Sequence, residues 1–144
     1  MIVARTEHEA IVRMADGEDL LGELMKLPIG SGIIICGIGM LRDIELGYWT
    51  GRCYEKHRLD TPVELVSLQG NLAQLGKERI AHLHACVAKR DGSALGGHLF
   101  CGTVHNTAEI AIQLPSGIVL ERREEKPGQN SLRPRLKPQL EDAS

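Results

Sequence analysis

One stretch decides the fold of this chain: Ala81-His82-Leu83-His84-Ala85-Cys86-Val87-Ala88-Lys89-Arg90-Asp91-Gly92-Ser93-Ala94-Leu95-Gly96-Gly97-His98-Leu99-Phe100. Apolar residues recur at every second position on both sides of Asp91-Gly92, a dipeptide typical of the turn of a β-hairpin. We therefore expect antiparallel strands over residues 81–88 and 94–100, joined at that turn.

His82 and His84 lie on one face of the first strand, because side chains two residues apart on a strand point the same way. Counted from the centre of the turn, the returning strand brings His98 next to Ala85. A shift of one residue places it opposite His84. The Gly96-Gly97 pair leaves room beside the rings, so three imidazoles converge from two strands.

Three neutral imidazoles in this arrangement suit Zn²⁺ or another late first-row divalent metal, with a fourth position open to water or a partner's side chain. The sequence therefore predicts a metal site at His82, His84 and His98. The competing interpretation is that the three histidines are half-buried and hydrogen-bonded to their neighbours.

Cys86 shares the strand face of the two neighbouring histidines, so it is either a fourth ligand or a small buried thiol. No cysteine pair has Cys-x-x-Cys spacing, and we expect buried, reduced thiols. The other cysteines are Cys36, Cys53 and Cys101. The remaining histidines belong to no such group, and we expect them on the surface or hydrogen-bonded; they are His8, His57 and His105.

Outward from this hairpin, the sequence pattern predicts one helix and seven or eight strands. Apolar residues recur at helical spacing over residues 20–27, after the acidic start at 16–19, and Pro28 ends the run. The other expected strands are Glu9–Met14, Ile33–Gly39, Asp43–Trp49, Arg52–His57 and Val63–Leu68, with a bend at Gly70-Asn71 and a last pair, Ala108–Leu114 with Ile118–Arg122. These elements predict an α+β domain with a largely antiparallel, curved sheet.

The composition narrows the function classes. The chain has 144 residues, of which 42% are hydrophobic and 3% aromatic, and a net charge of −2. These values exclude a globally basic nucleic-acid surface and leave few rings for base stacking. Tyr48, Trp49 and Tyr54 gather on one expected hairpin, which favours a pocket rim or a subunit contact. With no apolar run long enough to span a membrane and no signal-peptide pattern, we expect a cytoplasmic protein.

We expect residues 1–121 to form one domain and residues 122–144 to form a flexible, basic tail that contains prolines. The tail is either a solvated segment or a phosphate-contacting arm for DNA. Its basic residues are Arg122, Arg123, Lys126, Arg133, Arg135 and Lys137.

Several known motifs are missing. A cupin also carries His-x-His, but Ala88 and Lys89 stand where its glutamate belongs. Gly37-x-Gly39 lacks the third glycine of a dinucleotide-binding fingerprint. The chain has neither a nucleophile elbow nor a Walker loop.

Eight short motifs nonetheless occur together and in order. They are Gly17-Glu18-Asp19-Leu20, Gly37-Ile38-Gly39, Leu46-Gly47-Tyr48, Glu64-Leu65-Val66-Ser67-Leu68-Gln69-Gly70-Asn71, His82-Leu83-His84, Asp91-Gly92, Gly96-Gly97-His98-Leu99 and Thr107-Ala108-Glu109-Ile110. Over residues 9–122 the chain resembles the PPC domain, the plant-and-prokaryote-conserved domain that also occurs in plant AT-hook nuclear proteins.

The resemblance implies a strongly bent antiparallel sheet, a homotrimer, and a metal, zinc foremost, held by His82, His84 and His98. It implies a regulatory or assembly role and a stand-alone prokaryotic member. The plant AT-hook sequence Arg-Gly-Arg-Pro is missing here, and Arg133-Pro134-Arg135 lacks its glycine. Direct DNA binding therefore stays an open alternative.

The other alternative is a small zinc-dependent hydrolase or lyase, since a zinc ion held by three histidines with an open position lowers the pKa of its bound water to about 7. Such an enzyme needs a general acid or base, for which Glu64 and Glu109 are the candidates. Glu64 is expected to point inward with Val66 and Leu68, where it either acts on a substrate or bonds the nearby backbone.

Overall fold

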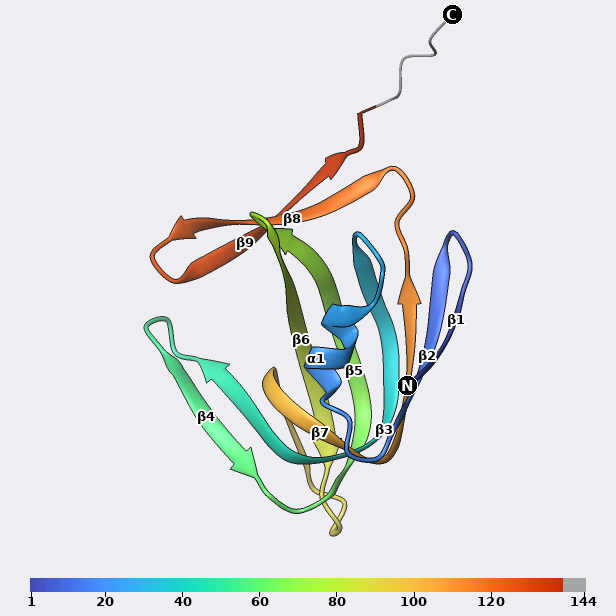
Figure 1. Ribbon diagram of the computed structural model, residues 1–144. Helices are drawn as coiled ribbons and strands as arrows, with labels where there is room; N and C mark the ends of the chain where they lie inside the picture. Colours follow the sequence, from blue (N-terminus) through green and yellow to red (C-terminus); the bar gives the residue numbers. More distant parts are fainter. Residues whose placement is uncertain (139–144) are drawn as a thin grey trace, which may run out of the picture.

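The computed structural model describes residues 1–138. Within them, nine strands form one sheet and a single helix, α1 (Leu20–Lys26), packs against it (Figure 1). The strands are β1 (Ile2–Arg5), β2 (Glu9–Ala15), β3 (Gly32–Trp49), β4 (Tyr54–Leu59), β5 (Val63–Leu75), β6 (Glu78–Ala88), β7 (Ala94–Gln113), β8 (Ile118–Lys126) and β9 (Gln129–Leu136). No helix in this part of the chain is long and apolar enough to cross a membrane.

Four long strands close on themselves, because β3 and β6 each pair with both β5 and β7. This closure needs strong bending, and β-bulges supply it: the β3–β7 register shifts at four points and the β5–β6 register at one. The parallel pairing of β5 with β8 makes the sheet mixed, although the other ladders are antiparallel. The expected α+β class with a bent sheet is therefore confirmed.

The expected β3–β4 hairpin is present, as is the β6–β7 hairpin predicted from its Asp91-Gly92 turn. Other expected strands prove to be parts of longer ones. Ile33–Gly39 and Asp43–Trp49 both belong to β3, and β7 contains both Ala94–Phe100 and Ala108–Leu114. Bulges rather than turns take up the irregular residues between these segments, and a bulge leaves little trace in a single sequence.

The bend expected at Gly70-Asn71 does not occur, because β5 continues to Leu75. Gly70 has a φ of +147°, and a Cβ atom at this position would collide with the carbonyl oxygen of His82. The glycine thus serves the close approach of β5 to the strand that carries two of the histidines, and does not reverse the chain.

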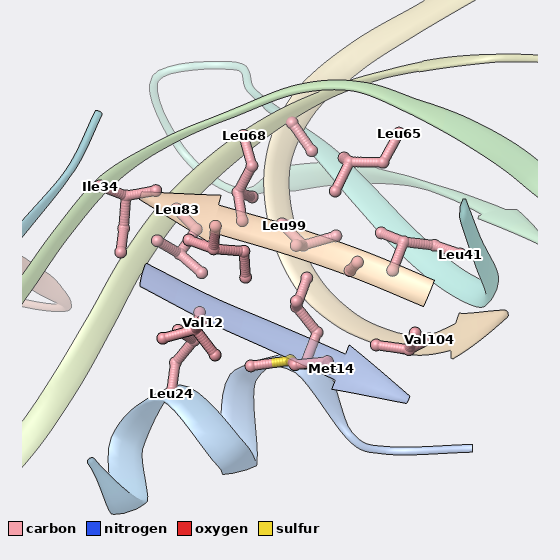
Figure 2. Packing of buried hydrophobic residues seen from close by; sticks show 14 of the residues in the cluster. Val12, Met14, Leu24, Ile34, Leu41, Leu65, Leu68, Leu83, Leu99 and Val104 are labelled. Atoms are coloured by element: carbon pink, nitrogen blue, oxygen red, sulfur yellow. The ribbon is translucent and has the colours of Figure 1, made fainter. Parts of the chain in front are cut away.

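The core lies where α1 covers the concave side of the sheet, and Figure 2 shows its buried side chains. The helix contributes Leu20 and Leu24, which share one face at i, i+4 spacing. Leu83 of β6 is fully buried in the same cluster. Since Leu83 stands between His82 and His84, the core fixes which face of β6 carries the histidines.

Arg79 of β6 ties the helix to this strand. Its guanidinium donates to the carbonyl oxygen of Met25 at 2.9 Å, and also to the carbonyls of Leu27 and Ile29. Carbonyls at a helix C-terminus lack intrahelical partners and carry partial negative charge, which this partly buried cation offsets.

The chain beyond residue 117 differs most from expectation. The predicted pairing of Ala108–Leu114 with Ile118–Arg122 is wrong, since β8 pairs with β9 and touches β5 instead. Residues 122–136, expected as a tail, belong to this β8–β9 ribbon. Pro127-Gly128 makes its turn, with Gly128 at a φ of +76°, as a type II turn requires. Residues 139–144 of the expected tail lie outside the described residues.

Candidate metal centre

The β6–β7 hairpin brings three histidines together. His84 pairs directly with His98, in the register one residue from the turn-centred count, and His82 lies two residues earlier on the same face of β6. One ligand nitrogen from each ring lies within 4.8 Å of the others. Nitrogens around a tetrahedral zinc ion are about 3.3 Å apart, so small ring rotations bring all three into reach of one ion.

The rings are packed at similar separations: their centroids are 4.9 Å apart for His82 and His98, 5.2 Å for His82 and His84, and 5.4 Å for His84 and His98. Burial, followed by the positive charge of Arg122, lowers the pKa of His82 to about 4. Burial also lowers the pKa of His98. Both rings are therefore neutral at pH 7, the form that binds metals.

One observation tests whether this group fits a metal. The Nδ1 atom of His98 is buried and has no hydrogen-bond partner among residues 1–138. Buried polar atoms are rarely left unpaired, because the loss of their water partners costs free energy. Three imidazoles are also the donor set that zinc and its neighbours in the first row accept. The residues therefore fit such an ion.

His82 and His98 open into a pocket of about 490 Å³ between two β-ribbons, and His84 is exposed beside it. In Figure 1 the β8–β9 turn lies above the tip of the β3–β4 hairpin, and both contribute to the pocket wall. The lining residues are Trp49, Tyr54, Ile80, His82, His98, Arg122, Gly128, Gln129, Asn130, Ser131 and Leu132. The site thus has an open side of small-molecule size.

Arg122 was expected in a solvated tail, but it lies in this pocket and is only 7% exposed. Its Nη1 donates to the carbonyl oxygen of Asn130 at 2.8 Å, and its Nη2 donates to Oδ1 of Asn71 at 3.1 Å. Strand alternation is the signal that could have predicted this position. The side chains of Leu120 and Arg122 are both buried, so the period-2 pattern of β8 continues through residue 122.

The chain matches the model of a known protein family. The family model described as the Plants and Prokaryotes Conserved (PCC) domain matches residues 1–114. The chain belongs to this family.

Among curated relatives of this PCC protein, the bifunctional protein GlmU of Synechococcus sp. (strain JA-2-3B'a(2-13)) is 33% identical over 108 residues, which are 70% of this chain and 16% of that protein. The GlmU of Synechococcus sp. (strain JA-3-3Ab) is 31% identical over 106 residues, with the same coverage. The chain thus spans about a sixth of the length of these relatives.

Solved structures share the PCC fold. A plant- and prokaryote-conserved protein from Pyrococcus horikoshii has a TM-score of 0.80 and 31% identity, covering 95% of this chain and 96% of that one. A metal-containing protein from Archaeoglobus fulgidus has a TM-score of 0.77 and 28% identity, covering 91% and 94%. A "putative dna binding protein" from Bacteroides thetaiotaomicron has a TM-score of 0.82 and 24% identity, covering 92% and 96%, which shows the fold alone.

An aromatic cluster supports the third histidine of the PCC domain. The ring of Tyr54 lies 5.2 Å from that of His98, 5.1 Å from Trp49 and 4.9 Å from Phe100, between centroids. Gly47 of β3 pairs with His98, and Gly97, next to His98, packs against the Gly47 backbone. Gly97 therefore allows β3 and β7 to approach closely and does not leave room beside the rings. Of the three aromatics expected together, Trp49 and Tyr54 line the pocket, as one of the two interpretations predicted, whereas Tyr48 does not and is 67% exposed.

Neither candidate acid lies in the histidine pocket. The expectation that Glu64 points inward is wrong: its side chain is exposed, and a bulge between Leu65 and Ser67 changes the alternation of β5. Glu109 is exposed on β7, where its register partners are Arg13 and Ile38.

The four thiols also differ from expectation. Cys86 is half-buried and does not join the three imidazoles, which form the group of possible ligands found within residues 1–138. The other three cysteines are exposed. Cys53 lies in the β3–β4 turn and Cys36 directly follows a bulge, so strand alternation does not predict their burial.

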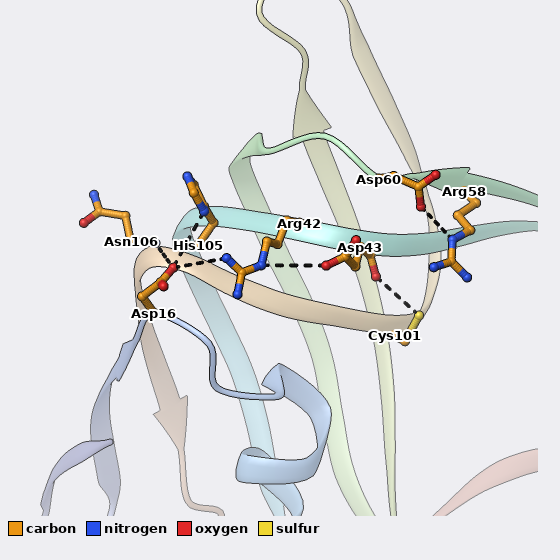
Figure 3. Close-up of polar contacts among 8 residues, drawn as sticks. All are labelled: Asp16, Arg42, Asp43, Arg58, Asp60, Cys101, His105 and Asn106. Atoms are coloured by element: carbon orange, nitrogen blue, oxygen red, sulfur yellow. Dashed lines mark hydrogen bonds and ion pairs between the residues drawn. The ribbon is translucent and has the colours of Figure 1, made fainter.

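The remaining histidines lie elsewhere. His8 and His57 are exposed. Figure 3 shows the third, His105, whose Nδ1 lies 3.6 Å from Oδ1 of Asp16, an oxygen that also accepts from the backbone N–H of Asn106 and pairs with Arg42. Asp16 is more than half exposed, so this is a surface polar group.

Proposed function

We propose that this PCC domain binds one late first-row divalent ion, zinc foremost, through His82, His84 and His98, and works as a trimeric module of regulatory or assembly role. The convergence of three imidazoles, two of which line the pocket, carries the proposal. The unpaired Nδ1 of His98 and the low pKa of His82 support it, because both favour a bound cation over protons. The similar A. fulgidus protein is itself described as metal-containing.

Three protein ligands leave one coordination position for water or another group, and a bound zinc ion would supply Lewis acidity there. The chain's own contribution is orientation. Buried Leu83 sets the face of β6, and the aromatic ring of Tyr54 packs against His98. These contacts limit ring motion, so little conformational entropy is lost when the ligands bind the ion.

The trimer is supported by apolar side chains on the outside of the sheet. Ile11 of β2, Ile35 and Ile38 of β3, and Val66 of β5 are each about half exposed. Ile11 and Ile35 line one shallow hollow, so part of this surface is continuous. Exposed apolar groups on one sheet are typical of surfaces that a partner covers.

DNA binding is a weaker candidate. Proteins of similar fold carry that description. In this chain, however, carboxylates partly neutralise the basic ribbon: Arg133 pairs with Glu125 at 2.6 Å, and Arg135 pairs with Glu121 at 2.6 Å. Arg122 is buried and cannot reach a phosphate backbone in this conformation. A salt-dependent DNA-binding assay with and without the 122–144 segment tests this candidate, and unchanged binding would contradict a role for the ribbon.

A zinc-dependent hydrolase or lyase is favoured by one observation, the open side of the histidine site. Against it, the pocket lining within residues 1–138 contains no aspartate or glutamate that could act as a general acid or base. Binding without turnover therefore agrees better with the site.

The metal content of purified protein tests the proposal. We expect about one zinc-like ion per chain by elemental analysis, and none after combined His82→Ala, His84→Ala and His98→Ala substitution. The matched control changes His8, His57 and His105 to alanine and keeps the ion. Sedimentation equilibrium should give three times the 15.8 kDa chain mass. Loss of metal from the control set alone would falsify the assignment.

A further inference from the structure

Arg122 is a buried cation without a charged partner. It is 7% exposed, and none of the ion pairs within residues 1–138 includes it. Burial lowers its pKa, and no nearby carboxylate opposes this effect. Arginine is seldom buried unless an anion accompanies it, because removing the charge from water is costly.

Its hydrogen bonds leave donors unused. The guanidinium has five N–H groups. One Nη1 hydrogen goes to the Asn130 carbonyl and one Nη2 hydrogen to Asn71 Oδ1, and both acceptors are neutral. The Nε atom is buried without a partner. These bonds explain how Arg122 holds the β8–β9 ribbon to β5, but they do not explain why the position carries a charge.

The surroundings of Arg122 are positive or neutral. The pocket lining contains His82, His98 and Arg122 among apolar, hydroxyl and amide groups, and no carboxylate. A bound divalent ion would add two more positive charges. Trp49, Tyr54 and Leu132 supply an apolar wall, and a volume of about 490 Å³ suits a small organic molecule.

We propose that this pocket binds a small organic carboxylate, with the carboxylate on Arg122 and the apolar part against Trp49 and Tyr54. The inference rests on the proposed metal-binding function, since His82 and His98 line the same pocket. A guanidinium donates two parallel hydrogen bonds to a planar carboxylate, which a lysine cannot reproduce. The ligand supplies the negative charge that the pocket lacks.

Benzoate and its neutral analogue benzamide are the probes. Trp49 is the only tryptophan in the chain and lines the pocket, so its fluorescence reports occupancy, with calorimetry as a second readout. On metal-loaded protein at fixed ionic strength, we expect benzoate to bind at least tenfold more tightly than benzamide. Arg122→Met should weaken benzoate at least tenfold, and Arg122→Lys should restore only part of the affinity. Arg123→Met, at a side chain 72% exposed, is the matched control and should change nothing.

The outcomes separate the two proposals. Wild-type protein that binds no metal contradicts the proposed function. Protein that binds metal normally but shows no preference for benzoate over benzamide, or an Arg122→Met variant with wild-type affinity, overturns the carboxylate site alone. If Arg122→Met fails to fold, the wild-type benzoate and benzamide pair still decides. Phenyl phosphate binding more tightly than benzoate would also overturn the carboxylate assignment, in favour of a phosphate ligand.

Discussion

Adding one methyl group at Gly97 should disturb the metal site, whereas adding one at Gly96 should not. A Cβ atom at Gly97 would lie 2.7 Å from the carbonyl oxygen of Gly47, which pairs with His98 across β3 and β7. A Cβ atom at Gly96 would lie 3.4 Å from its nearest neighbour, the carbonyl oxygen of Ala85. Neither glycine has the positive φ that would strain an alanine. The two variants therefore differ in space alone.

The clash at Gly97 is with backbone, so β7 must move by roughly 0.7 Å to reach an ordinary contact. Overpacking of this kind costs about 1–3 kcal/mol of unfolding free energy. Metal–nitrogen distances tolerate only about 0.2 Å, so the shift of His98 should also weaken metal binding about tenfold. Gly96→Ala should change stability by less than about 0.5 kcal/mol and leave the metal affinity unchanged.

The assays are chemical denaturation of the metal-free protein and competition for Zn²⁺ with a chromophoric chelator. If Gly97→Ala matches the wild type in both, or if the two alanine variants behave alike, then the close β3–β7 contact does not position His98 and the geometric argument fails.

Three more predictions follow from other contacts. Arg79→Met should lower the unfolding free energy by about 2–3 kcal/mol, because three carbonyls at and just after the end of α1 lose their donor. The control, Arg90→Met in the exposed β6–β7 turn, should leave the unfolding free energy unchanged. Denaturation curves of the two variants that coincide would contradict this prediction. The second prediction concerns His82 in metal-free protein. Its imidazole takes up a proton near pH 6.5 in the unfolded chain, but only near the lowered pKa of about 4 in the folded chain. Because the unfolded chain then binds more protons, the free energy of unfolding should fall as the pH drops from 6.5 to 4. After allowance for partial exposure, the wild type should lose about 1–2 kcal/mol more than His82→Gln between pH 7 and 4.5, and equal losses would contradict the buried, neutral ring. Ile38→Asp should shift the sedimentation mass from trimer to monomer, with Leu136→Asp, at a side chain 78% exposed, as the control that stays trimeric; a trimeric Ile38→Asp variant would place the interface elsewhere.

The candidate site was predictable because it depends on local geometry. The Asp91-Gly92 turn and strand alternation were sufficient to place His82, His84 and His98 together, and only the choice between two neighbouring registers was open. Each of these signals acts within a few residues, where backbone stereochemistry limits the choices.

The long-range features were not predictable in the same way. The bulge between Leu65 and Ser67 reverses the alternation that placed Glu64 inside, and its position depends on how β5 bends around the closed sheet. The basic residues and prolines of residues 122–144 predict a solvent-exposed tail, and this prediction includes Arg122. Its burial depends on the β8–β9 ribbon folding back over residues more than fifty positions earlier, including Asn71. A single sequence does not show such tertiary contacts.

Anomalous diffraction from crystals of the metal-loaded protein tests the central claim most directly. Data collected on both sides of the zinc absorption edge should show one peak per chain, in contact with nitrogens of His82, His84 and His98 at about 2.0–2.1 Å. A peak held by carboxylates, or crystals of zinc-loaded protein with no peak among these three rings, would contradict the account.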